Sequence, residues 1–241
     1  MTSIKMFDCI SLCRLVAGVI AVLGVCYGCC VPKTFFGPVR VVRTTVAPGM
    51  PDTSVELFLN AYDAANKRVA VAFPVGYQNT IYTRHIFDFG KGIHLVTTGE
   101  WYGPGNSHTK CAKYPLNVPW REACVPENAT KSEGFYMGHK TEQYYRQLDA
   151  VAFTYTQGST KAKVMVTQDT CFPVGEVIYD TGDPAGARVI NRLYVNQTTD
   201  ANDGFFQPPV NVTCVPNPNP LPMTQWQRVA FLGWMLGLQQ Q

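Results

Sequence analysis

The sequence predicts an all-β protein built from antiparallel strands, and three observations support this fold class. Apolar and polar residues alternate over short runs between residues 39 and 195, as in strands with one buried face. Val, Ile, Thr, Tyr and Phe fill these runs, while Gly, Pro, Asn and Asp fill the gaps. The runs are short and regularly spaced, which is typical of an antiparallel sandwich or barrel.

Four predicted hairpins account for most of the runs. Each consists of two alternating stretches around a turn rich in Asp, Asn, Gly or Ser, such as "DAAN" in the first and "GKG" in the second. The hairpins join residues 55–62 to 67–74, 80–89 to 92–98, 150–156 to 161–167, and 174–180 to 187–195.

The remaining stretches are less regular. Residues 100–135 are rich in Gly, Pro and Asn and predict a long loop with one strand near Cys111. Residues 140–150, "KTEQYYRQLDA", predict either the one helix of the body or an extended strand. Residues 217–241 predict a proline-rich linker and a short apolar tail, either disordered or a helix that contacts a membrane or a partner. Its apolar stripe would consist of Trp226, Val229, Ala230, Trp234 and Leu238.

The N-terminus is typical of a secretory signal peptide. Basic residues precede a charge-free apolar run over residues 15–28, and small residues end it, so we expect cleavage after Gly28. The alternative is a membrane anchor, but the run is shorter than the ~20 residues that span a bilayer. We therefore expect a secreted, extracellular protein whose β domain covers residues 29–216.

Cysteine usage agrees with secretion. An even number of cysteines follows the predicted cleavage site, and disulfides are the default in an oxidising compartment. "CYGCC" resembles half of a zinc site, but no matching pair of ligands follows it. The six predicted half-cystines are Cys29, Cys30, Cys111, Cys124, Cys171 and Cys214. Three sequons predict N-glycans at Asn128, Asn196 and Asn211.

The sequence offers little support for catalysis or for nucleic-acid binding. The net charge is only +3 and no basic run exceeds two residues. The four histidines form no metal-ligand pair, and no serine lies in a nucleophile elbow, so we expect no enzyme. Asp200 and Asp203 in "TTDANDG" resemble part of a calcium loop, but an ordinary Asp/Asn/Gly turn explains them equally simply.

Composition favours a binding module with an apolar pocket. The chain has 13 Phe and 12 Tyr against four His, which suits an apolar cavity with few polar anchors. Residues of one parity in four strands are predicted to line it, and the opposite parity, including Asn60, is predicted to face solvent. The predicted lining is Leu57, Leu59, Val69, Val71, Phe73, Phe153, Tyr155, Val164 and Val166. The competing hypothesis is an adhesive glycoprotein without a small-molecule ligand.

Five motifs resemble the ependymin family when taken in order. They are "CCVP", "YDAANKRVAV", "KCAKYPLNVPW" before the sequon "ENAT", "CFPVGE" and "GFFQPPVNVTC", and they extend the resemblance over residues 30–216. The resemblance implies two stacked, strongly curved antiparallel sheets, similar to bacterial lipoprotein-carrier domains, around a deep apolar pocket. It also implies a secreted, glycosylated homodimer that holds a hydrophobic or lipid ligand and is linked to calcium binding and cell–matrix adhesion.

The resemblance further implies two disulfides, Cys30–Cys171 and Cys111–Cys214. Cys29 and Cys124 depart from the family pattern, which places its third pair elsewhere. These two extra cysteines could pair with each other. Because Cys29 and Cys30 are adjacent, the partner of Cys171 stays open at the level of sequence.

Overall fold

The computed structural model describes residues 29–46, 52–75, 81–100, 109–137, 140–141, 144–145, 148–181, 187–210 and 212–221. The predicted signal peptide and nearly all of the predicted tail lie outside these ranges. Within them, no helix has the length and apolar character needed to cross a membrane.

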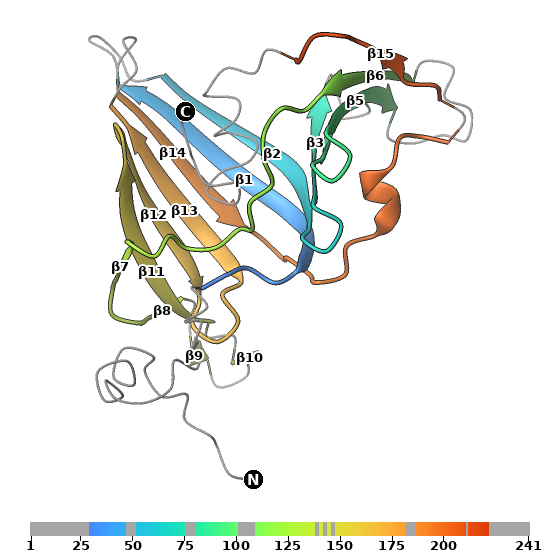
Figure 1. Cartoon of the computed structure of the whole chain (residues 1–241). Coiled ribbons are helices and arrows are strands. Elements are labelled where there is room, and N and C mark those ends of the chain that lie inside the picture. The colour runs from blue at the N-terminus through green and yellow to red at the C-terminus, as the bar shows by residue number, and fades with distance from the viewer. Residues whose placement is uncertain are drawn as a thin grey trace, which may run out of the picture.

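One large curved sheet dominates the described chain (Figure 1). Its first strands are β1 (Thr34–Val46), β2 (Asp52–Asp63), β3 (Arg68–Val75), β4 (Ile81–Asp88), β5 (Ile93–Glu100) and β6 (Lys110–Pro115). The others are β7 (Thr130–Lys131), β8 (Phe135–Met137), β11 (Leu148–Gln157), β12 (Thr160–Thr167), β13 (Pro173–Asp180), β14 (Ala187–Tyr194) and β15 (Val215–Pro216). The strand order is β15-β6-β5-β4-β3-β2-β1-β14-β13-β12-β11-β7, with β8 also paired to β11.

The all-β prediction and its four hairpins are confirmed. The pairs β2–β3, β4–β5, β11–β12 and β13–β14 are antiparallel neighbours, and hydrogen bonds connect them into one continuous curved sheet. Among the described strands, β15 departs from antiparallel pairing and runs parallel to β6. The central strand β1 pairs with both β2 and β14, which brings the first and last thirds of the body together.

Residues 140–150 adopt the extended alternative wherever the structure describes them. Strands β9 (Lys140–Thr141) and β10 (Tyr144–Tyr145) form a small two-stranded sheet, and β11 starts at Leu148. A helix there was the wrong expectation. Adjacent tyrosines suit extended backbone, since aromatic side chains favour strands.

The sheet buries side chains on both faces. Residues 116–129, which we call the strap, lead from β6 to β7 and cross one face, which we call the strap face (Figure 1). Because β6 and β7 lie near opposite ends of the strand order, the strap links the two sides of the curved sheet. The main core lies on the strap face and includes Val39, Val41 and Ile178.

The opposite face carries a smaller core, under the segment that leads from β14 to β15. A short 3₁₀ helix, η2 (Asp203–Phe206), places Phe206 against Ala61, Ala70, Ile86 and Leu95. Arg68 bonds to Asp203 at 2.7 Å and packs over the Phe206 ring, which holds η2 against the sheet.

Candidate ligand-binding face and its disulfide-anchored strap

Seven of the nine predicted lining residues lie together at the strap face. Directly paired residues in a sheet project to the same side, and Val151, Phe153 and Tyr155 pair with Val166, Val164 and Ala162. The seven are Val69, Val71, Phe73, Phe153, Tyr155, Val164 and Val166, all within or packed against the main core. Phe73 and Phe153 are only partly buried, whereas most of their neighbours are fully buried.

The prediction is wrong for Leu57 and Leu59. Asn60 pairs with Val71 and Tyr62 pairs with Val69, so the even-numbered residues of β2 share the strap face. Phe58 is accordingly 2% exposed, whereas Leu57 is 56% exposed. Asn60, predicted to face solvent, is buried there. The hairpin turn sets Asp63 opposite Arg68 and thereby fixes this register, which alternation within one strand cannot reveal.

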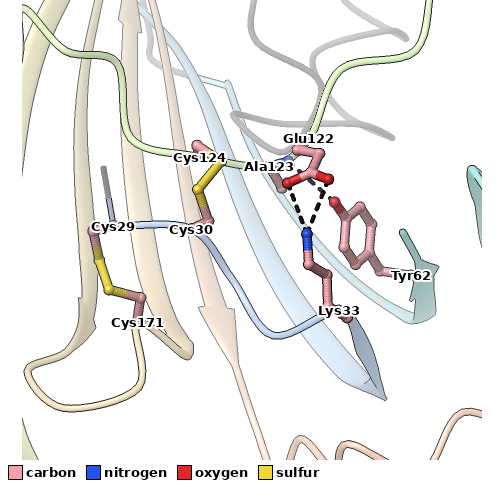
Figure 2. Close-up of a disulfide and its surroundings, with 8 residues drawn as sticks. All are labelled: Cys29, Cys30, Lys33, Tyr62, Glu122, Ala123, Cys124 and Cys171. Atoms are coloured by element: carbon pink, nitrogen blue, oxygen red, sulfur yellow. Dashed lines mark hydrogen bonds and ion pairs between the residues drawn. A yellow bond between two sulfur atoms is a disulfide. The ribbon is translucent and has the colours of Figure 1, made fainter. Parts of the chain in front are cut away.

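The strap is held to the lead-in of β1 by backbone hydrogen bonds and a disulfide (Figure 2). Val31 N–H donates to the carbonyl of Ala123 at 2.9 Å, and Val125 N–H donates to the carbonyl of Cys29 at 2.8 Å. Between these bonds Cys30 is bridged to Cys124. The strap therefore pairs with residues 29–31 as a short strand segment above the sheet.

Tyr62 ties the strap to the sheet beneath it. Its hydroxyl accepts a 3.1 Å hydrogen bond from Ala123 N–H, and its ring stacks between Phe35 and Trp120. Burial raises the pKa of the Tyr62 hydroxyl to about 12. The exposed pair Lys33–Glu122, 2.9 Å apart, flanks this contact (Figure 2).

The disulfide pairing corrects one implied bond. Cys29 pairs with Cys171, Cys30 pairs with Cys124, and the Cys111–Cys214 bond forms as the resemblance implied. Successive side chains of an extended segment point to opposite sides, so Cys30 faces the strap while Cys29 faces the turn before β13 (Figure 2). Cys30–Cys171 is therefore the wrong pair, and the two extra cysteines bond to different partners.

A buried ion pair joins two neighbouring strands on the strap face, and the sequence alone did not reveal it. Arg192 Nη1 on β14 donates to Glu176 Oε2 on β13 at 2.7 Å, and both side chains are almost completely buried. The partly exposed pair Arg43–Glu56 lies on the same face. Glu176 shares parity with Val174 and Ile178 in β13, which was the one signal of its burial. Buried charges are tolerated only when paired, so each partner needs the other.

Besides the ion pair, two histidines form a polar contact on the strap face. His85 Nδ1 and His94 Nε2 are 3.1 Å apart, and both rings stack near Phe87. Burial lowers the pKa of His85 to about 4 and, together with the nearby His85, lowers the pKa of His94 to about 3. Both rings are thus neutral near pH 7, as hydrogen-bonded members of a mostly apolar core.

The stretch that resembles a calcium loop forms the start of η2. The side chain of Asn202 accepts from Gly204 N–H at 2.8 Å, and the carboxylate of Asp203 accepts hydrogen bonds from Arg68 and Gln207. These contacts are those of a capped turn. They occupy the carboxylate of Asp203 with protein donors.

Two predicted glycan acceptors lie within the described residues. Asn128 is exposed in a turn of residues 127–128, and Asn196 is exposed with φ 47° just after β14. Both positions are compatible with a bulky sugar. Asn211 lies outside the described residues.

An all-β chain with three disulfides and an apolar sheet face beneath an anchored strap fits an extracellular protein. Residues 83–212 match the Ependymin family, and the chain belongs to that family. No curated protein matches the sequence.

Two solved bacterial structures resemble the chain at low identity. An uncharacterized conserved protein from Thermus thermophilus is 8% identical with a TM-score of 0.37, over 75% of this chain and 90% of that one. A LolA superfamily protein from Nitrosomonas europaea is 13% identical with a TM-score of 0.32, over 73% and 91%. Scores this low say nothing about a ligand.

Proposed function

We propose that this ependymin-family chain is a secreted glycoprotein that binds a hydrophobic, lipid-like ligand on the strap face. The observation that carries the proposal is the gathering of seven predicted lining residues on one sheet face beneath the strap. Phe73 and Phe153 are only partly buried on this face. Apolar rings that the fold leaves incompletely covered are where an apolar ligand gains most from contact.

Lipid extraction followed by mass spectrometry of protein secreted from eukaryotic cells tests this function. We expect a co-purifying lipid in near-stoichiometric amount. A fluorescent acyl lipid should then bind delipidated protein, and Phe153→Ala should weaken that binding more than it lowers the melting temperature. Absence of both an extracted lipid and saturable titration would remove the proposal.

We further propose that the protein is not an enzyme. Support comes from the two histidines of the strap face, because His85 and His94 contact each other and aromatic rings, as structural histidines do. Calcium enters the proposal through the family resemblance alone, and an isothermal titration with Ca²⁺ tests it.

We further propose that the face opposite the strap is an interaction surface, for a second copy of the chain or for a matrix protein. The face opposite the strap exposes apolar side chains on four neighbouring strands of the sheet. They are Val55 and Leu57 on β2, Leu193 on β14 and Tyr179 on β13, with the half-buried Val42 of β1 between. Contiguous exposed apolar side chains are typical of interaction surfaces.

A further inference from the structure

Arg192 has hydrogen-bonding capacity that the described protein does not use. One nitrogen, Nη1, donates to Glu176, while Nε and Nη2 are buried and form no hydrogen bond to any described residue. The whole residue is only 1% exposed. Buried polar groups in folded proteins are nearly always hydrogen-bonded, so two unused donors on one guanidinium require an explanation.

The position of Arg192 relates it to the proposed ligand face. Val41 pairs with Arg192 and Glu176 pairs with both Arg192 and Val164, so all four side chains project from the strap face. Tyr155, one of the predicted lining residues, projects from β11 on the same face, two strands beyond Glu176. The unused donors thus lie within the apolar face and not at its rim.

We propose that Arg192, with the hydroxyl of Tyr155 on the same face, is the polar anchor of the lipid ligand and binds an uncharged acceptor group at the head of the acyl chain. Ester and amide carbonyls and alcohols are groups of this class. The proposal rests on the lipid-binding function proposed above.

Charge balance favours an uncharged head over a free carboxylate. Glu176 already neutralises Arg192, and Glu56 neutralises Arg43 on the same face. A carboxylate would add a second negative charge near Glu176 and lose its own hydration. A carbonyl oxygen satisfies N–H donors without bringing charge, and a site built to bond such a group discriminates strongly against analogues that lack it.

The test compares three ligands of equal chain length on delipidated, glycosylated full-length protein. They are monooleoylglycerol, oleate and 1-octadecene, each measured by displacement of a fluorescent acylglycerol. We expect the wild type to bind monooleoylglycerol about tenfold more tightly than either of the others, the effect of one good hydrogen bond.

Arg192→Lys is the informative variant, because lysine keeps a cation for Glu176 but loses the planar set of donors. We expect it to weaken monooleoylglycerol binding about tenfold and to leave octadecene binding unchanged. Arg68→Lys is the matched control, an ion-paired arginine at the opposite face, and should alter neither affinity.

Tyr155→Phe keeps the ring and removes only the hydroxyl, so it tests the anchor without changing the ion pair. It keeps the proposal testable if Arg192→Lys does not fold. Equal loss for monooleoylglycerol and octadecene in both variants would assign these residues a structural role and overturn the anchor. Preferential binding of oleate by the wild type would overturn the uncharged head group. Failure of the wild type to bind any of the three would instead refute the proposed function itself.

Discussion

Adjacent residues of β2 differ sharply in what they contribute. Phe58 projects into the main core at the strap face and packs on Phe73, with ring centroids 5.3 Å apart. Leu57 projects from the other face and is exposed. Since the two residues share a strand, they provide a matched comparison of the two faces.

We expect Phe58→Ala to lower the free energy of unfolding by about 3–5 kcal/mol, because it leaves a cavity in a packed core. Leu57→Ala should change it by at most about 0.5 kcal/mol, as exposed substitutions do. Urea denaturation of both variants measures the difference. Equal losses would contradict the observed register of β2.

A second prediction at this scale concerns pH. The unfolded chain binds a proton at His94 below its ordinary pKa of 6.5, whereas the folded chain does so only near 3. The stability that the neutral ring contributes is therefore complete above pH 6.5 and is lost as the pH falls from 6.5 toward 3. At about 1.4 kcal/mol per pKa unit, lowering the pH to 5 costs about 2 kcal/mol.

His94→Gln should remove that share of the pH dependence, because the amide can still bond to His85 but does not titrate. Urea denaturation at pH 7.5 and pH 5.0 measures it. The difference between wild type and variant isolates His94 from the carboxylates, which titrate in both. An unchanged pH dependence would mean that the ring is solvated in the folded protein.

At the scale of elements, the strap stands out because a disulfide secures it at its middle. Its backbone bonds to residues 29–31 are few, and isolated pairs of short strands are marginal in water. The Cys30–Cys124 bond and the Tyr62 contacts therefore carry much of its attachment.

Replacing both cysteines, Cys30→Ser with Cys124→Ser, should cost about 2–5 kcal/mol of stability, in the range typical of a native disulfide that closes a long loop. It should also make the strap the first site of proteolysis, which limited trypsin digestion at Arg121 would detect. The control removes Lys33 instead, by Lys33→Ala, and should leave the rate of cleavage at Arg121 unchanged, because exposed ion pairs contribute little. A protected strap in the double variant would show that packing alone holds it.

At the scale of the whole molecule, the two sheet faces differ in how completely they are covered. The strap crosses one face, and η2 covers part of the other over β3 and neighbouring strands. The part over β2, β1, β14 and β13, which no described segment crosses, is the surface proposed for a second copy of the chain.

If that surface is a dimer interface, Leu57→Lys should shift the protein toward monomer without unfolding it. A lysine in a two-fold interface is repeated in both subunits and places unpaired charge in an apolar contact. Sedimentation velocity over a range of concentrations measures the shift. Val210→Lys, an exposed apolar position on the segment after η2, is the control. Identical sedimentation of both variants and the wild type would place any dimer contact elsewhere.

Much of the fold could be predicted because its signals are local. Alternation, β-branched residues and turn residues identified the four hairpins, and the ordered motifs identified the ependymin family. The alternating pattern also placed Val69, Val71, Phe153 and Val164 on one face, because alternate residues of a single strand project to the same side. Such signals depend only on neighbours along the chain.

Only the tertiary structure decided which residues of different elements meet. The odd-numbered positions of β2 carry most of its apolar residues, yet the hairpin register sends the even-numbered Phe58 inward and Leu57 outward. Either Cys29 or Cys30 could chemically bond to Cys171, and the direction of each side chain in the extended lead-in decides between them. Glu176 and Arg192 meet because β13 and β14 align them on one face, where burial makes each charge require the other.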